Sequence, residues 1–282
     1  MNDDLQATRT STLTRRAALS TLGTFGAAAL LGACTSNSKV GTLLPETAPT
    51  SPAGGDTTST AQSTQTTPPD ASTGCSTIPA ETAGPFPGDG SNGKNILNQE
   101  GVVRKDIRSS IGAASGVAEG VPVTITFAIV DSATGCSPLA GAAVYVWHCD
   151  RDGNYSMYSD ATIDENYLRG VQVADSDGLV SFMSIFPGDY AGRWPHVHFE
   201  VYPDLAAALA SQGILSTSQL AFPEDVCDAV YVTDGYAQSI ANLALTSLTT
   251  DGVFRDDGAV HQLATMSGTV ESGLTASLTV AV

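Results

Sequence analysis

Short hydrophobic runs rich in β-branched residues follow one another along most of the chain after residue 120. Turns that contain Gly and Asp, such as Asp152-Gly153 and Asp177-Gly178, separate these runs. Short strands punctuated in this way predict an all-β fold, a β-sandwich of mainly antiparallel strands. Only 205–212 and 236–245 have helical character, so we expect one or two short helices. The predicted strands cover residues 121–131, 142–148, 179–185, 197–202 and 229–233.

The first 34 residues have the pattern of an export signal. Arg15 and Arg16 precede an uncharged run, 17–33, which ends in Leu-Gly-Ala before Cys34. The paired arginines indicate the twin-arginine (Tat) route. The ending is typical of a lipoprotein signal, in which Cys34 is lipidated and becomes the mature N-terminus. A transmembrane anchor is the alternative, but the run is short and rich in Gly and Ala for a span of about 20 strongly apolar residues.

Residues 35–73 consist mainly of Thr, Ser, Pro, Ala and Gly, with almost no large apolar side chain. Such a segment cannot bury enough surface to offset its ordering entropy, so it predicts a disordered tether. Residues 74–282 remain, which is enough for one domain with a substantial core. We expect this domain outside the cytoplasm, lipid-anchored to the membrane or secreted.

The formal net charge of the 282 residues is −17. A surface of that sign repels nucleic acid and anionic headgroups, so we expect neither as a partner. Membrane contact is therefore expected only through the N-terminal lipid. The sequence leaves the oligomeric state open, a homo-oligomer included.

Four cysteines follow Cys34, an even number in a chain expected outside the cell, where disulfides persist. Three pairings are possible. Cys136 with Cys149 would close a local loop and leave Cys75 to pair with Cys227. Four free thiols are less expected in an exported chain, and a four-cysteine zinc site lacks a close CxxC pair.

His196 and His198 are two residues apart in a segment that suits a strand. Side chains alternate faces along a strand, so both imidazoles leave the same side as a chelating pair. Tyr190 lies just upstream after a Pro-Gly turn, and nitrogen beside anionic oxygen suits ferric iron. On the histidines alone, a half-buried polar pair or a zinc site is an equal alternative.

Several blocks together resemble the intradiol ring-cleavage dioxygenases, the family of catechol and protocatechuate dioxygenases. The resemblance runs from about Cys75 to the low 260s, and the order of the blocks makes it specific. The blocks are Glu81-Thr82-Ala83-Gly84-Pro85-Phe86, Val103-Arg104-Lys105-Asp106-Ile107, Trp147-His148-Cys149-Asp150 followed by Gly153-Asn154-Tyr155-Ser156, Leu168-Arg169-Gly170, and Pro187-Gly188-Asp189-Tyr190 followed by Arg193 and His196-Val197-His198.

This resemblance implies an enzyme with one Fe(III) per domain. Its metal ligands would be Tyr155, Tyr190, His196 and His198. For Tyr155 alone, a surface turn residue is the plainer interpretation, and Tyr158 is its neighbour and competitor.

The implied reaction opens a catechol-type substrate between its two hydroxylated carbons with O2, giving a cis,cis-muconate. Tyr190 would leave the iron and serve as a base, and Arg193 would stabilise negative charge on the ring. Gly84 and Pro85 match the loop that lines the substrate slot.

The chain departs from the better-known members between Tyr190 and Arg193, where only Ala191 and Gly192 intervene. Gly192 lies near where the protocatechuate enzymes carry a Trp, so the pocket wall should differ and the substrate cannot be borrowed. Two other functions stay open: a non-catalytic ligand-binding β-sandwich lipoprotein, and a zinc protein that uses the His-x-His pair. The complete set of two tyrosines and two histidines favours the enzyme.

Overall fold

The structure is a computed structural model that describes residues 75–282. The predicted signal peptide with Cys34 and the tether 35–73 lie outside the described residues. Between residues 75 and 282, every helix is too short or too polar to cross a membrane.

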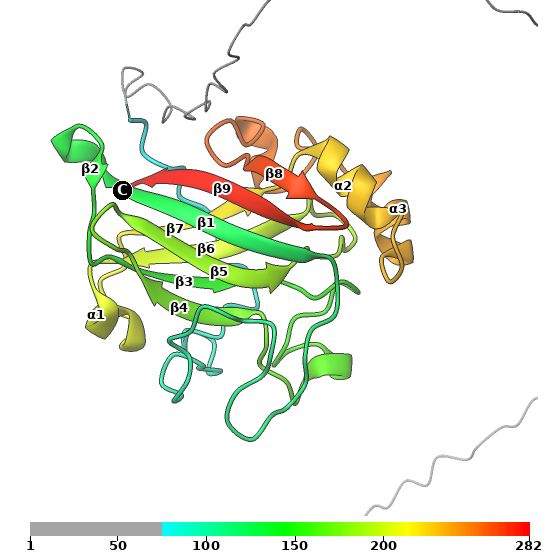
Figure 1. Ribbon diagram of the computed structural model, residues 1–282, viewed down its shortest axis with the longest axis horizontal. Helices are drawn as coiled ribbons and strands as arrows, with labels where there is room; N and C mark the ends of the chain where they lie inside the picture. The colour runs from blue at the N-terminus through cyan, green and yellow to red at the C-terminus, as the bar shows by residue number, and fades with distance from the viewer. Residues whose placement is uncertain (1–74) are drawn as a thin grey trace, which may run out of the picture. The chain divides into compact units, whose positions relative to one another are not determined.

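The described chain is built mainly from strands (Figure 1). They are β1 (Pro122–Asp131), β2 (Ser137–Pro138), β3 (Ala143–Trp147), β4 (Arg169–Val173), β5 (Leu179–Ile185), β6 (His196–Tyr202), β7 (Ser216–Ala221), β8 (Thr265–Thr269) and β9 (Gly273–Ala281). The helices are α1 (Leu205–Leu209), α2 (Glu224–Tyr231) and α3 (Ala237–Leu243), with single 3₁₀ turns η1 (Ser132–Thr134), η2 (Asp160–Thr162) and η3 (Phe254–Asp256).

Two sheets form the sandwich. One has the order β2-β1-β9-β8, with β5 paired to the other side of β1, and the second has the order β4-β3-β6-β7. All pairings are antiparallel except that of β1 with β9, which is parallel over eight register pairs from Val123↔Leu274 to Val130↔Ala281. The predicted β-sandwich of mainly antiparallel strands is therefore confirmed.

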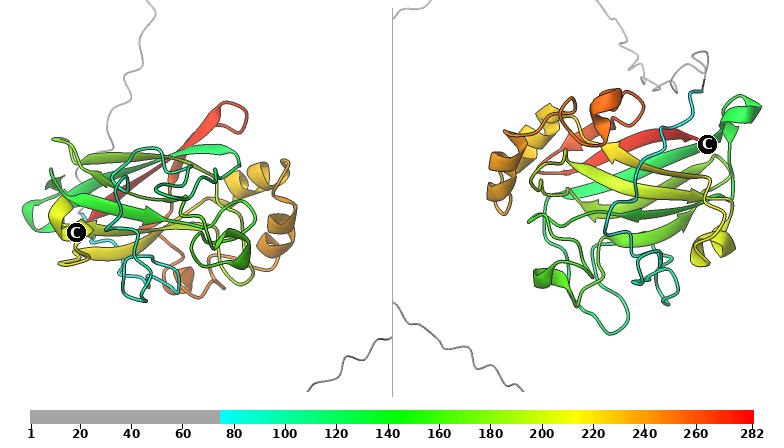
Figure 2. Two further views of the ribbon diagram at one scale, coloured as in Figure 1. Left: turned by 90° about the horizontal axis from the view of Figure 1, so that it is seen from below. Right: turned by 180° about the vertical axis from the view of Figure 1, so that it is seen from behind.

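Strand alternation divides β6 between two environments. Val197, Phe199 and Val201 belong to the main core between the sheets, where the ring of Phe199 lies 4.8 Å from that of Phe127 on β1. His196 and His198 therefore point to the outer face of the four-stranded sheet. The segment from residue 75 to about residue 100 crosses that sheet when the domain is seen from behind (Figure 2), which explains why both histidines are buried.

The strand predicted at 229–233 is wrong, because residues 224–231 form α2. Pro223 precedes the helix, Glu224 and Asp225 occupy its first turn, and acidic side chains are favourable there. Cys227, Val230 and Tyr231 are buried at helical spacing. The β-branched residues at 230 and 232 suggested a strand, and tertiary packing overrode that preference.

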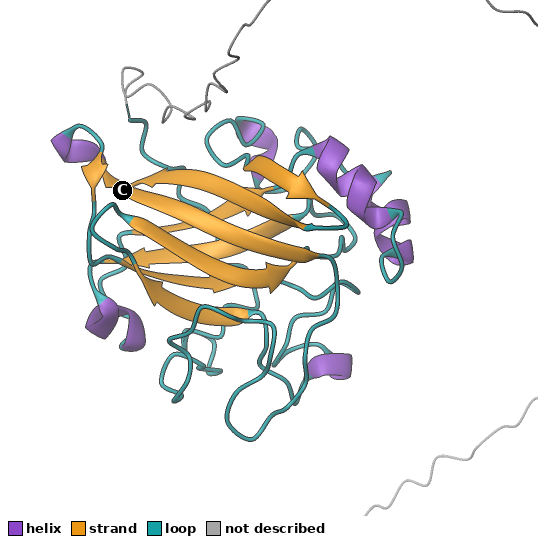
Figure 3. Cartoon of the chain, in the orientation of Figure 1, coloured by secondary structure: helices purple, strands orange, loops and turns teal. Residues whose placement is uncertain are grey.

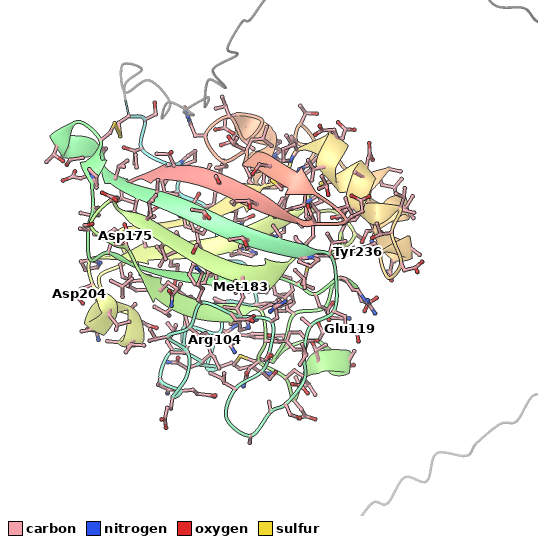
Figure 4. All side chains as sticks on the ribbon, viewed as in Figure 1. Arg104, Glu119, Asp175, Met183, Asp204 and Tyr236 are labelled. Atoms are coloured by element: carbon pink, nitrogen blue, oxygen red, sulfur yellow. A yellow bond between two sulfur atoms is a disulfide. The ribbon has the colours of Figure 1, made fainter. Side chains whose placement is uncertain are left out.

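The two helices predicted at 205–212 and 236–245 are present as the shorter α1 and α3. Asp204 begins α1, where its side chain accepts the N–H of Ala207 at 2.8 Å, and Tyr236 immediately precedes α3 (Figure 4). With α2, the described chain holds three α-helices instead of one or two. They lie at the periphery of the sandwich (Figure 3).

The disulfide joins Cys75 to Cys136, so the suggested pairings of Cys136 with Cys149 and of Cys75 with Cys227 are both wrong. The N–H of Ile78 donates to Ala281 O, and Ala281 pairs with Val130 near the end of β1. The start of the domain therefore lies beside the turn that carries Cys136. Cys149 and Cys227 are buried and form no disulfide in the described part of the chain, so the expectation that all four cysteines are disulfide-bonded is also wrong.

Candidate metal centre

Strand β6 supplies the two imidazoles of the site. It lies between β3 and β7, so its backbone is fixed on both edges. His196 and His198 are 2% and 3% exposed, and their Nε2 atoms are 3.1 Å apart. The His-x-His spacing thus places both nitrogens at one point, as the sequence predicted.

The two tyrosines come from loops that pack closely against each other. Tyr155 follows a tight turn in which Asp150 Oδ1 accepts the N–H groups of residues 152 and 154. Tyr190 follows the Pro-Gly turn after β5. A Cβ on Gly188 would lie 2.3 Å from Arg151 O, so only glycine allows the loop of Tyr190 to approach the loop of Tyr155 this closely.

The four predicted ligand atoms converge. Nε2 of His196 lies 3.3 Å from Tyr155 Oη, 3.2 Å from Tyr190 Oη and 3.1 Å from His198 Nε2. The two phenol oxygens are 3.3 Å apart. Nδ1 of His196 is hydrogen-bonded to Trp194 O, which assigns the ring proton to Nδ1 and leaves the Nε2 lone pair facing the other donors.

Burial opposes charge on all four side chains. It raises the pKa of Tyr155 well above its ordinary range and raises the pKa of Tyr190 to about 12. It lowers the pKa of His196 to about 3 and the pKa of His198 well below its ordinary range. Two neutral imidazoles and two phenols that ionise only beside a cation are a donor set prepared for a metal.

The spacing of these atoms fits one metal ion. Nitrogen and oxygen ligands bind transition metals at about 2.0–2.2 Å, which sets neighbouring ligand atoms roughly 3.0–3.5 Å apart. Within residues 75–282, no group of three or more His, Cys, Asp or Glu side chains is arranged to hold a metal. The candidate centre is of another kind, because half of its donors are phenols, and phenolate oxygen favours a hard ion such as Fe(III).

Arg193 lies at the edge of this centre, with Nη1 3.4 Å from His196 Nε2. Its Nε donates to Asp251 Oδ2 at 2.9 Å and its Nη2 to Gln219 Oε1 at 2.6 Å. Asp251 and Gln219 are both fully buried, so the guanidinium is held in a fixed orientation. Arg193 is therefore not part of an ordinary surface ion pair.

Of the two predicted pocket residues, Gly84 contacts the site and Pro85 does not. A Cβ on Gly84 would lie 3.4 Å from Cε1 of His198, so this glycine touches a candidate ligand. Pro85 is exposed beside it, and its carbonyl accepts a hydrogen bond from Asn92. Phe86 packs its ring 5.0 Å from the ring of Tyr155.

The short link between Tyr190 and Arg193 leaves open space. Ala191 and Gly192 are exposed, and no atom lies within 4 Å of the position of a Cβ on Gly192. Tyr190 is only half-buried at this side, whereas Tyr155 is 2% exposed.

Tyr158 and His148 serve other roles. Tyr158 Oη donates to Asn92 Oδ1 and accepts the Gly88 N–H, which directs it away from the histidines. His148 is buried, with Nε2 2.7 Å from Ser184 Oγ. It is a satisfied core histidine.

The sequence analysis missed Gln219, Asp251 and Phe254. Gln219 stands opposite His198 in the register of β7 with β6, and Phe254 lies with its ring centre 6.5 Å from that of His196. A glutamine in the short polar strand 216–221 gave only a weak signal. Asp251 reads as an ordinary Asp-Gly turn, and nothing local connects it to Arg193.

A family model described as "Dioxygenase" matches residues 104–258, more than half of the chain. The chain belongs to the intradiol ring-cleavage dioxygenase family. The resemblance noted in the sequence is thereby confirmed, and family membership implies non-haem iron.

Curated relatives of the dioxygenase match it in short segments. The chlorocatechol 1,2-dioxygenase of Rhodococcus opacus is 46% identical over 57 residues, 20% of this chain and 22% of that protein. The chlorocatechol 1,2-dioxygenase of Pseudomonas sp. strain P51 is 33% identical over 94 residues, 27% of this chain and 37% of that protein. The chain thus spans between about a fifth and two fifths of the length of these relatives.

A solved structure similar to the whole described domain is the intradiol ring-cleavage dioxygenase from Tetranychus urticae. It aligns with a TM-score of 0.57 and 26% sequence identity, covering 73% of this chain and 94% of that one. This similarity agrees with the family assignment and with the two-sheet fold.

Proposed function

We propose that this chain is a non-haem Fe(III) dioxygenase that opens catechol-type diols between the two hydroxylated carbons, using O2, to give cis,cis-muconate-type products. One observation carries the proposal: two phenol oxygens and one imidazole nitrogen lie 3.1–3.3 Å from a fourth donor, His196 Nε2. Tyr155, Tyr190, His196 and His198 would hold one ion per domain. When bound, Fe(III) would supply the Lewis acidity that favours the dianion of a catechol and activates its ring.

The two tyrosines would have different roles, because Tyr155 is buried and Tyr190 is only half-buried. Tyr155 is enclosed, with Phe86 against its ring, so it stays in place. Tyr190 is half-buried and precedes an exposed, open link. Once ionised beside the metal, its Oη would therefore have room to move and to accept a proton from a substrate hydroxyl.

Arg193 would stabilise negative charge that develops on the substrate ring. Its Nη1 lies beside His196 Nε2, where negative charge on a chelated ring would develop. Because Asp251 and Gln219 already fix the guanidinium, little reorganisation is needed when that charge forms. Gly84 keeps the space over His198 free of a side chain.

The test is to load purified protein with ferric iron and record its visible spectrum before and after adding catechol under nitrogen, then to admit oxygen. We expect a tyrosinate-to-iron band, a shift of that band with catechol, and uptake of one O2 per muconate formed. Stoichiometric zinc with no visible band would overturn the proposal. A coloured protein that binds catechol without product would support a binding protein instead.

We also propose that the domain is exported by the Tat route and tethered through lipid on Cys34. The leader and tether composition supports this, and the disulfide of Cys75 with Cys136 suits an oxidising compartment. The mass of membrane-extracted protein tests it. A wild-type protein that retains Met1 and stays in the cytoplasm would contradict it.

A further inference from the structure

Arg169, from the Leu-Arg-Gly block, is a buried cation without a carboxylate. It is fully buried, and no carboxylate of the described residues lies within ion-pair distance of it. Burying a charge is costly unless hydrogen bonds satisfy it. Its guanidinium donates to two backbone carbonyls and two hydroxyls, which are Ser156 Oγ (3.1 Å), Ser156 O (3.0 Å), Pro87 O (2.8 Å) and Tyr145 Oη (3.4 Å).

One side of the guanidinium holds the loop of Tyr155. Nε and Nη2 both bind Ser156, the residue directly after Tyr155. The Ser156 hydroxyl in turn donates to Tyr167 O at 2.7 Å, so it has no freedom to turn away. The backbone on the C-terminal side of Tyr155 is therefore fixed from β4.

The other side holds the segment that covers the histidines. Nη1 binds Pro87 O, which also accepts the hydroxyl of Tyr145 at 2.7 Å. Phe86, one residue earlier, packs on Tyr155, and Gly84 touches His198. A Cβ on Gly88 would lie 2.8 Å from Arg169 Nη1, so the segment approaches the guanidinium closely.

His198 depends on this packing for its orientation. Its Nδ1 is buried and has no hydrogen-bond partner among residues 75–282, unlike Nδ1 of His196. Its ring instead stacks on Trp147 at 4.9 Å and 5°, and Trp147 stacks on Tyr145 at 5.1 Å. Arg169 contacts the far end of that stack through the Tyr145 hydroxyl.

We infer that Arg169 is a positioning residue, which sets the two candidate ligands Tyr155 and His198 at metal-binding distance. The inference rests on the proposed iron centre. An arginine suits the role because its planar fork reaches acceptors on two chain segments at once, whereas a lysine ammonium is a single point of contact.

The experiment compares wild-type protein with Arg169→Lys and Arg169→Met. Ferric affinity is measured by competition with a chelator, together with the position of the visible band and the melting temperature without metal. Loss of a residue that orients metal ligands typically lowers metal affinity by about 10- to 100-fold. We expect that loss and a displaced band in both variants, with lysine failing to rescue.

Arg104→Met is the matched control. Arg104, labelled in Figure 4, is also an arginine that donates to backbone carbonyls, including Arg169 O at 2.7 Å. None of its hydrogen bonds goes to Ser156 or Pro87. The Arg104→Met variant should have a lower melting temperature but unchanged ferric affinity and an unchanged visible band. Equal loss of affinity in Arg104→Met would show a general structural effect and overturn the inference.

Two further outcomes decide the matter. Arg169 variants that bind iron like the wild type would overturn the positioning role while leaving the proposed function intact. A wild type that binds no ferric iron would overturn the proposed function, and this inference with it.

If the Arg169 variants do not fold, Tyr145→Phe replaces them. Tyr202→Phe is then the control, because the Tyr202 hydroxyl donates to Glu200. We then expect a several-fold loss of affinity in Tyr145→Phe alone, and equal affinity in both would overturn the inference.

Discussion

Nε of Arg193 lies 2.9 Å from Oδ2 of Asp251, and the same oxygen accepts the backbone N–H of Trp194 at 2.6 Å. The other carboxylate oxygen, Oδ1, accepts the N–H groups of Val253 and Phe254. One buried carboxylate thus ties the arginine of the site to the backbone just before His196 and to the aromatic residue beside it. The ion pair therefore belongs to the buried candidate centre and not to the surface.

Arg193→Ala should therefore lower kcat by roughly a hundredfold or more, the usual effect of removing one stabilising contact to developing charge. The ferric band and its shift with catechol should persist, because Arg193 donates no ligand atom. Steady-state kinetics and titration of the band check this. Arg255→Ala on the exposed part of η3 is the control, and near-native turnover in Arg193→Ala would remove the residue from the mechanism.

Tyr155→Phe and His198→Ala should each lose most of the bound iron, because each removes a donor atom from the convergent set. Iron per chain and the visible absorbance measure this directly. Tyr158→Phe is a close control, since its hydroxyl binds Asn92 and Gly88, and it should stay coloured. Full colour in both of the first two variants would mean that other residues hold the metal.

Cys75→Ser should destabilise the domain by roughly 4 kcal/mol, as expected for opening a cross-link across 61 residues. Chemical denaturation measures the difference. Alkylation of the unreduced, unfolded protein should label Cys149 and Cys227 and spare Cys75 and Cys136. Labelling of Cys75 or Cys136 in the wild type would contradict the disulfide.

Glu200→Gln should change the stability of the domain in a pH-dependent way. Burial raises the pKa of Glu200 to about 7 from an ordinary 4.5, and Tyr202 donates to its carboxylate. A carboxyl with a raised folded-state pKa stabilises the fold fully only at low pH, and that contribution is lost as the pH rises toward 7.

The glutamine variant should accordingly be more stable than the wild type at pH 8, by at most about 3 kcal/mol, and nearly equal to it at pH 4.5. Melting curves across this range check the gap. Glu100→Gln, at an exposed position, should show no such dependence. A constant difference between Glu200→Gln and wild type would show that the carboxyl does not titrate in this window.

Site residues could be predicted from the sequence where they lie close together along the chain, and not where distant segments meet. The spacing of His196 and His198 is local and determined by the period of a strand, so the chelating pair was readable from two positions. Tyr190 was suggested by its place just upstream of the histidines, whereas Tyr155 was found only through the order of whole blocks. Asp251 and Gln219 reach Arg193 across 58 and 26 residues, and no local pattern encodes such contacts.

The wrong predictions, the strand at 229–233 and the disulfide pairing, also concern features that contacts between distant segments determine. α2 contains β-branched residues that suit a strand in isolation, and its amphipathic packing on the sheet decides otherwise. The disulfide joins residues that the parallel pairing of β1 with β9 brings together, which spacing along the chain does not reveal.

Both tryptophans of this chain lie beside the candidate histidine ligands. Trp147 stacks on His198, and the carbonyl of Trp194 is hydrogen-bonded to His196. All indole emission of the protein therefore originates from side chains next to the candidate ligands. Ferric iron there should quench this emission, so the occupancy of the centre can be followed in unlabelled protein at concentrations too low for its colour to be seen.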